Sequence, residues 1–221
     1  MGWTLPTLLI LLTEIHTMPI VQLDQQLSHQ LADLYQRMET AYDQVAKALN
    51  FTCAGCPDNC CDSYFQHHTY IEWAYLWEGL NELAPERLQE ITARAKDYIK
   101  AAEASLARDE RPMIMCPLNE AGLCALYKHR LMICRMHGVP SLLRRPDGQQ
   151  LHFPGCFRCQ EIVEGRSGEI PSVDRTKLYL ELIELENRLT KNLRHILPRV
   201  KKSIAQMIVQ GPPEFSGCGF K

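Results

Sequence analysis

The stretch Cys53-Ala54-Gly55-Cys56-Pro57-Asp58-Asn59-Cys60-Cys61 concentrates four thiols in one short segment of the chain. Its Gly, Pro, Asp and Asn residues favour tight turns and interrupt any helix or strand. Five more cysteines follow within the turn-rich stretch 113–160: Cys116, Cys124, Cys134, Cys156 and Cys159. The tenth, Cys218, stands alone in a Gly-containing tail, and we interpret it as a spectator. The arrangement of these cysteine-bearing segments relative to one another is therefore the main feature that the fold has to determine.

The types and spacing of these residues indicate metal binding. Thiolates are soft ligands that suit zinc ions and iron–sulfur clusters better than magnesium or calcium. Two intervening residues let one turn aim both sulfurs at the same metal, and this C-x-x-C spacing occurs at Cys53/Cys56 and at Cys156/Cys159. We predict nine metal ligands: Cys53, Cys56, Cys60, Cys61, Cys116, Cys124, Cys134, Cys156 and Cys159.

Nine thiolates carry too much negative charge for one four-coordinate ion, so either two sites exist or some cysteines do not bind metal. Consecutive side chains diverge, so Cys60 and Cys61 could serve different metals, or one could support the other without binding metal itself. Cationic neighbours could offset the charge, although each could equally be a solvated surface residue. These are Lys128, Arg130, Arg135 and Arg158.

Five histidines lie near the cysteines in sequence: His67, His68, His129, His137 and His152. A mixed Cys/His site is possible in principle. A surface or supporting role is the better interpretation for any single histidine. His137 is the preferred candidate ligand, because it follows Cys134 by three residues.

Length and charge narrow the class of protein. A chain of 221 residues fits one domain with a real core, and a net charge of −2 gives no global attraction to nucleic acid or an anionic membrane. The basic residues between 194 and 202 are interpreted as a solvated helix face. We expect a protein partner, no nucleic acid and no membrane.

The N-terminal stretch decides the expected compartment. Its apolar run 3–12 is too short to span a bilayer and lacks the positive residues of a secretory signal. Translation could begin at Met18, so residues 1–17 are expected to be an extension. We therefore expect a cytoplasmic protein, a compartment in which disulfides are unusual. The adjacency of Cys60 and Cys61 also disfavours a bridge between them.

Apolar periodicity predicts a mostly α-helical bundle enclosing a cysteine-rich, metal-binding loop region. Helices are expected over 23–49, 67–83, 85–106 and 178–196, with a shorter helix opening at Pro198 and containing Val200, Ile204 and Ile208. Residues 149–153 could be one strand of a hairpin. The expected organisation is a single domain over 18–210 with a cysteine-rich core over 53–159, followed by a flexible tail over 211–221.

Several blocks of this sequence resemble the YkgJ-like cysteine-cluster family, described as zinc- or iron-chelating. The matching blocks are 53–61, Cys116-Pro117-Leu118, Gly122-Leu123-Cys124-Ala125-Leu126-Tyr127, and Arg130 with Cys134-Arg135. They correspond to the family's CxxCxxCC, C-P, G-x-C-x-x-Y and R-P-x-x-C-R blocks. Three residues instead of two separate Cys56 from Cys60, and Leu131 replaces the usual proline. His137 stands where an aromatic residue is common.

The resemblance implies metal chelation without naming a reaction. We expect an iron–sulfur protein, with a 4Fe-4S cluster foremost, acting in electron transfer or as an accessory to a redox or modification enzyme. The alternative is a zinc-stabilised module that recruits a protein partner. A metal-dependent modification enzyme is a third possibility, since relatives of the cysteine block occur in a flagellin lysine methylase. The chain carries no dinucleotide loop, P-loop, nucleophile elbow or H-E-x-x-H motif, so whether it is an enzyme stays open.

Overall fold

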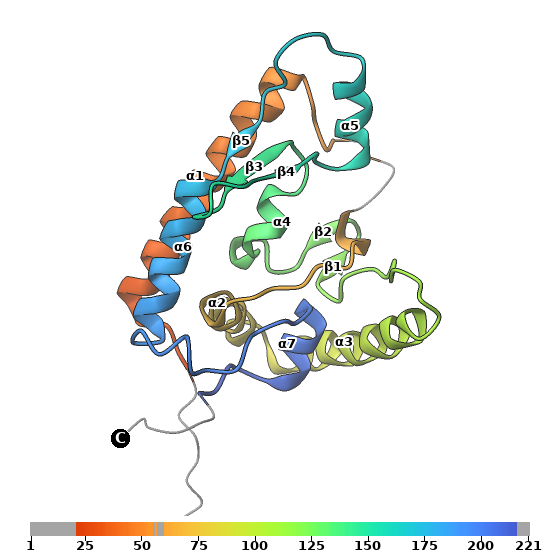
Figure 1. The fold of residues 1–221 in the computed structure, drawn as a ribbon. Helices are drawn as coiled ribbons and strands as arrows, with labels where there is room; N and C mark the ends of the chain where they lie inside the picture. The colour runs from red at the N-terminus through yellow and green to blue at the C-terminus, as the bar shows by residue number, and fades with distance from the viewer. Residues whose placement is uncertain (1–20, 55, 57–59, 216–221) are drawn as a thin grey trace, which may run out of the picture.

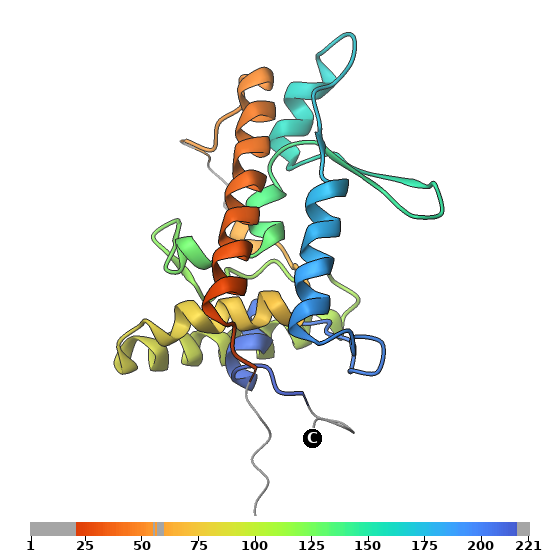
Figure 2. The same cartoon turned by 90° about the vertical axis from the view of Figure 1, so that its left-hand side faces the viewer.

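The computed structural model describes residues 21–54, 56 and 60–215 and is mostly α-helical, as predicted. Helices α1 (Gln25–Leu49) and α6 (Thr176–Leu189) lie side by side and run in opposite directions (Figures 1 and 2). Helices α2 (Tyr70–Asn81) and α3 (Pro85–Leu106) lie crosswise to this pair, and α7 (Ile204–Gln210) packs on α3. Much of the cysteine-bearing region lies between these two groups of helices, whereas its last helix, residues 157–164, lies at the far end of α1, away from α2 and α3 (Figure 1).

Helix α1 forms because its apolar residues recur every three or four positions, and Leu31 and Leu34 on that stripe are fully buried. Asp24 caps its start by accepting a hydrogen bond from the Leu27 N–H at 2.7 Å. Asn50 ends it in the left-handed conformation, with φ of 52°. The predicted helix over 23–49 is therefore confirmed to within two residues.

The crosswise layer also follows its sequence. Pro85 begins α3 at a position where its missing N–H costs nothing. Helix α2 is buried on most sides, as its aromatic content suggested, and Glu186 of α6 accepts the N–H groups of Tyr70 and Ile71 at its first turn. Buried Ile91 of α3 contributes to the same apolar core. No helix in the described ranges is both long and apolar enough to cross a membrane.

Two helix boundaries near the C-terminus differ from the prediction. Helix α6 ends at Leu189 instead of near 196, because Lys191 and Asn192 have positive φ angles of 49° and 60° that a helix cannot contain. Helix α7 begins at Ile204 instead of Pro198, where Ser203 forms a capping box with Gln206. The predicted stripe continued because Leu193 and Ile196 keep the helical spacing, although Ile196 is 55% exposed.

The cysteine-bearing region contains more regular structure than its lack of periodicity indicated. Its elements are η1 (Cys60–Asp62), β1 (Asn119–Glu120), β2 (Leu123–Cys124), η2 (Tyr127–His129), α4 (Met132–Met136), β3 (Ser141–Arg144), β4 (Gln150–Phe153) and α5 (Phe157–Glu164). The anticipated strand near 149–153 is confirmed as β4, which pairs antiparallel with β3. Strand β5 (Val173–Asp174) adds to β3 in parallel, and the β3–β4 hairpin projects from the body (Figure 2).

The chain beyond α7 is partly described. Trp73 donates to the Gly211 carbonyl at 2.9 Å, and Val21 N–H donates to the Pro213 carbonyl at 2.8 Å. The Phe215 ring meets the Tyr70 ring edge-on. Residues 211–215 thus pack on α2 and on the entry to α1. The predicted extension over 1–17 and the tail residues 216–221 lie outside the described residues.

Candidate metal centre

The folded chain divides the described cysteines into two sets. Set A contains Cys61, Cys116, Cys124 and Cys134. Set B contains Cys53, Cys56, Cys60, Cys156 and Cys159. The charges of the members of each set interact, although these residues come from distant parts of the chain, and the two sets meet at Cys60 and Cys61, whose charges also interact. None of these nine described cysteines forms a disulfide.

The backbone brings the first three members of set A together. The Cys116 N–H donates to the Cys61 carbonyl at 2.9 Å, which joins η1 to the segment before β1. Asn119 of β1 pairs with Cys124 of β2. Gly122, with φ of 88°, makes the tight turn between these strands, and its N–H donates to the Asn119 side chain at 3.1 Å.

Helix α4 supplies the fourth member, Cys134. Glu72 of α2 is buried and accepts the Met132 N–H at 3.0 Å, which fixes the first turn of this helix. Leu131 and Met136 on either side of Cys134 are almost fully buried and pack into the core. Set A is therefore held by short elements with an apolar shell behind them.

Burial and mutual charge both act on the set A thiols. Burial raises the pKa of Cys116 to about 12, and the Cys61 and Cys124 charges add to this rise. The pKa of Cys134 is raised well above its usual value, mainly by burial and then by the charges of Cys116, Cys124 and Cys61. Four thiols that oppose one another's ionisation are suited to a cation, which would remove this repulsion.

Two arginines supply positive charge beside set A. Arg130 and Arg135 both lower the pKa of Cys124, against the larger effect of burial. Glu39 of α1 holds them in place through Oε1, which accepts Nη2 of Arg130 at 2.8 Å and Nη1 of Arg135 at 2.5 Å. Arg135 also donates to the carbonyls of Arg130 and Lys128. The cationic role predicted for these two arginines fits this geometry.

Set B is built around Tyr42 of α1. The Tyr42 hydroxyl lies 3.7 Å from the Cys53 Sγ. A side chain added at Gly138 would place its Cβ 2.1 Å from that hydroxyl, so Tyr42 packs directly on the Gly138 backbone. The Gly138 carbonyl accepts the Cys156 N–H at 3.1 Å, which brings Cys156 to the same place as Cys53.

Helix α5 completes set B. Cys156 precedes the helix and Cys159 lies within it, fully buried, whereas the sequence placed both in a loop. Gly155, with φ of 86°, makes the turn into the helix, and an added Cβ there would meet the Gly138 carbonyl at 2.7 Å. Arg166 ties the end of α5 to α1 by donating to the carbonyls of Ala48 and Leu49.

The electrostatics of set B tie its remaining members to the same place. Cys60 is exposed as a whole residue. The pKa of its thiol is nevertheless raised to about 11, mainly by desolvation and then by the charges of Cys61, Cys53 and Cys156. The pKa of Cys159 is raised to about 11, mainly by burial and then by the charge of Cys156. The pKa of Arg158 is raised by a hydrogen bond to Cys56 and by the charges of Cys56, Cys156 and Cys53. Arg158 therefore links Cys56 to Cys53 and Cys156.

Neither set closes around a single ion. Across residues 21–54, 56 and 60–215, no three His, Cys, Asp or Glu side chains are arranged to hold one. Four thiolates on one zinc ion would lie about 3.8 Å apart, given tetrahedral geometry and a Zn–S bond near 2.3 Å. The donor chemistry of both sets still fits a soft metal, since each offers at least four thiols and has arginines beside it.

The five histidines near the cysteines in sequence have surroundings of their own. His137, the preferred histidine ligand, caps the end of α4 and meets the Phe65 ring edge-on at 4.8 Å, and burial followed by Arg111 lowers its pKa. His67 and His129 are buried beside Glu72 and Glu78 respectively. His68 and His152 are exposed.

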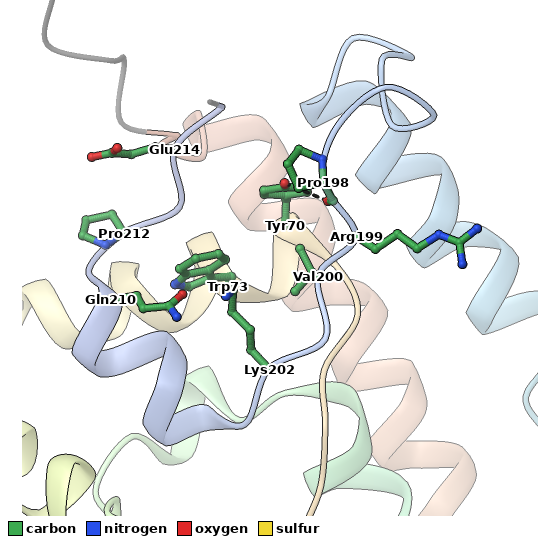
Figure 3. A pocket seen from close by; sticks show the side chains of 9 residues that line it. All are labelled: Tyr70, Trp73, Pro198, Arg199, Val200, Lys202, Gln210, Pro212 and Glu214. Atoms are coloured by element: carbon green, nitrogen blue, oxygen red, sulfur yellow. Dashed lines mark hydrogen bonds between the residues drawn. The ribbon is translucent and has the colours of Figure 1, made fainter. Parts of the chain in front are cut away.

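A pocket of about 290 Å³ lies where the chain after α6 crosses α2 (Figure 3). Tyr70 and Trp73 of α2 face it, Lys202 lies over the Trp73 ring, and Arg199 points away. Trp73 donates to the Met207 carbonyl, and Tyr70 to that of Pro198. The lining contains no cysteine, so this pocket does not belong to either set.

Comparisons with protein-family models, with curated proteins and with solved structures gave no match. The site is therefore interpreted from its own residues. Sequence reasoning missed three supporting residues, Glu39, Tyr42 and Arg166, because each contacts the cysteine region only through the tertiary fold. The sequence held no signal for them, because polar residues are frequent along α1.

Proposed function

We propose that this chain is a metal protein with two cysteine-ligated centres, one at set A and one at set B. The observation that carries the proposal is the gathering of nine thiols into two places from four separated segments. Such gathering without metal is unfavourable for ionised thiols, which repel one another, and is favourable when a cation binds them. Arg130 and Arg135 beside set A and Arg158 beside set B offset part of the remaining negative charge.

Iron–sulfur clusters are the preferred occupants. In a 4Fe-4S cluster each cysteine binds a different iron, so the sulfurs stand farther apart than around one ion. Both sets offer only cysteine thiols, which is the ligand set that holds most iron–sulfur clusters.

The chemistry supplied by such clusters is one-electron transfer, and the chain brings the two centres close together. Cys60 and Cys61 belong to different sets and are consecutive residues, whose Cα atoms lie about 3.8 Å apart across a trans peptide. A short path between two redox centres supports electron transfer to or from a protein partner. Exposed apolar residues next to the cysteines suit such a partner: Met113, Met115, Leu123, Tyr127 and Phe157.

Zinc is the second candidate, and one observation favours it. Set B contains both C-x-x-C pairs, Cys53/Cys56 and Cys156/Cys159, which is the spacing of many zinc sites. In that case the metal would stabilise the cysteine region, and the surface would recruit a partner without redox chemistry.

Metal analysis of anaerobically purified protein tests the proposal. We expect iron with acid-labile sulfide and a brown colour, with absorption near 400 nm that disappears in air. Cys124→Ser in set A and Cys156→Ser in set B should each remove about half of the metal. Cys218→Ser, at a position outside the described residues and both sets, is the matched control and should remove none.

The same measurement separates the alternatives. A colourless protein holding about two zinc ions would select the zinc module. Protein that binds neither metal, or that keeps its full metal content in both set variants, would refute the proposal.

A further inference from the structure

The segment that joins α6 to α7 carries positive charge that the fold leaves unbalanced. Between Glu186 and Glu214 the chain has six Lys and Arg residues and no Asp or Glu. Arg194 is neutralised by Glu186, whose carboxylate lies 3.1 Å from its guanidinium. Arg199 and Lys201 are exposed and form no ion pair with any described residue. The last part of this segment therefore attracts anionic groups.

The backbone at residues 198–202 is extended, whereas the sequence indicated a solvated helix face there (Figure 3). Lys202 pairs antiparallel with His67, whose N–H donates to the Lys202 carbonyl at 2.8 Å and whose carbonyl accepts the Lys202 N–H at 3.1 Å. Arg199 and Lys201 alternate with the paired side of the segment, and their N–H and C=O groups make no hydrogen bond to a described residue. This side of the segment is an open strand edge.

The side chains of the segment alternate as well. Val200 and Lys202 line the pocket of about 290 Å³, whereas Arg199 points away from it (Figure 3). Pro212 belongs to the opposite wall, and the Lys202 ammonium lies 5.2 Å from the centre of the Trp73 ring. The pocket has room for one side chain, and its Val, Pro and Trp residues suit an apolar one.

We propose that residues 198–202 bind an extended acidic peptide of a protein partner by strand addition. The backbone of the peptide pairs with the N–H and C=O groups of Arg199 and Lys201. Residues opposite each other on paired strands point to the same face, so acidic side chains at alternate peptide positions lie beside Arg199 and Lys201. The residue between them points to the other face and enters the pocket next to Val200 and Pro212.

Charge decides which peptide this edge accepts. Opposite charges directly across paired strands are favourable, and like charges are unfavourable. The backbone hydrogen bonds give affinity for any extended chain, and the cations of Arg199 and Lys201 restrict the choice to an acidic one. This inference goes beyond the proposed function, because the surface contains no cysteine and needs no metal.

Fluorescence anisotropy on the full chain, as purified, tests the surface. The probe is a short labelled peptide in which glutamate and leucine alternate. We expect saturable binding that weakens at least about tenfold in the double variant Arg199→Glu/Lys201→Glu, because both contacts become repulsive. Lys96→Glu/Lys100→Glu is the matched control, since it makes the same charge change at exposed positions of α3 outside the pocket lining and should bind like the parent. Equal weakening in the two double variants would overturn the proposal.

Modified peptides test the strand pairing and the pocket. Only every second N–H of a strand faces one neighbour, so backbone N-methylation at odd or at even positions should weaken binding at least about tenfold in one peptide and little in the other. Glycine in place of each leucine should weaken binding at least about threefold, because no apolar side chain then fills the pocket.

Two results would contradict the proposal. Equal affinities of the two methylated peptides would show that the peptide does not add as a strand. A single-stranded oligonucleotide that binds more tightly than the peptide, and loses this affinity in the Arg199→Glu/Lys201→Glu variant, would assign the segment to nucleic acid. The metal content of the protein affects neither outcome, so the proposed function is tested separately.

Discussion

At the scale of single residues, Glu39 is the group that connects the main helix to set A. One of its carboxylate oxygens accepts hydrogen bonds from both Arg130 and Arg135, and the Arg135 side chain is only 5% exposed. Without the carboxylate, two guanidinium groups would face each other in a partly buried place. Glu39 therefore keeps positive charge fixed beside Cys124.

We expect Glu39→Gln to lower the free energy of unfolding by about 2 kcal/mol, because a nearly buried arginine loses its counter-charge. Urea denaturation monitored by circular dichroism gives this value. Asp33→Asn is the matched control on the same helix, since Asp33 pairs with Arg37 in an exposed position and should cost less than about 0.5 kcal/mol. Equal effects of the two substitutions would contradict the role given to Glu39.

Glu72 is the residue from which a pH dependence is expected. Burial alone would raise the pKa of this carboxyl, but His67, Thr69 and the Met132 N–H together hold it below its usual value of 4.5. A carboxyl whose pKa is lowered by folding stabilises the protein above pH 4.5 and loses that contribution as the pH falls through the folded value.

Glu72→Gln should therefore cost about 2 kcal/mol at pH 7, and the difference from the parent protein should shrink as the pH falls below 4.5. Denaturation of both proteins at pH 7, 5 and 4 measures this difference. Glu181→Gln, which removes an exposed partner of Arg37, should change stability little at any of these pH values. A Glu72→Gln difference that grows at acid pH would show that the carboxyl acts in another way.

At the scale of elements, the close approach between α1 and the segment after α4 determines the geometry of set B. Gly138 allows this approach, because any Cβ there would collide with the Tyr42 hydroxyl. The same glycine accepts the Cys156 N–H through its carbonyl. One position thus sets the places of both Tyr42 and Cys156.

Gly138→Ala should destabilise the protein by about 1 to 3 kcal/mol, because Tyr42 has to move away from the added methyl group. Metal retention at set B should fall with it, while set A keeps its centre. Thermal unfolding and metal analysis report the two effects. Gly165→Ala is the control, since nothing lies within 4 Å of a Cβ at that position.

The sequence predicted elements wherever an apolar stripe was long enough to show its period. Helix α3 was predicted well, because Pro85 marks its start and the stripe runs from Leu88 through Ile91 to Leu106, before the break at Arg111-Pro112. Helices α4 and α5 were missed, since five and eight residues hold too few apolar positions to establish a period. The false extension of α6 came from Leu193 and Ile196, which keep the spacing beyond a turn.

The residue types of the candidate site could be predicted from the sequence, but the division of its cysteines into sets A and B could not. The C-x-x-C spacing pairs Cys53 with Cys56 and Cys156 with Cys159, and both pairs fall in set B. No local rule assigns Cys61 to Cys116, because their association depends on a backbone hydrogen bond between distant segments. Whether Cys60 and Cys61 serve different metals stays a prediction, since the Cys61 charge is the first that acts on Cys60.

At the scale of the whole molecule, the helical core and the cysteine region depend on different interactions. Leu31, Leu34, Ile71, Leu80 and Leu182 are fully buried among apolar neighbours. The segments that carry sets A and B consist of short strands, turns and two small helices. These segments bury less apolar surface of their own, so a metal would contribute a larger share of their stability.

Removal of metal should therefore loosen one part of the chain selectively. After anaerobic chelation, we expect faster amide hydrogen exchange over residues 53–68 and 113–165. Protection should be retained in α1, α2, α3 and α6. Exchange measured by mass spectrometry on metal-loaded and metal-free protein reports this pattern. Uniform loss of protection across the whole chain would mean that the helices themselves depend on metal.

The order of the cysteines along the chain has a bearing on biosynthesis. Every member of set A lies between Cys60 and Cys156, so set B encloses set A in the sequence. A ribosome, which extends the chain from the N-terminus, exposes Cys61 through Cys134 before it has made Cys156. On the proposed function, a centre at set A can be assembled on the nascent polypeptide, whereas a centre at set B has to wait until Cys156 and Cys159 have been made.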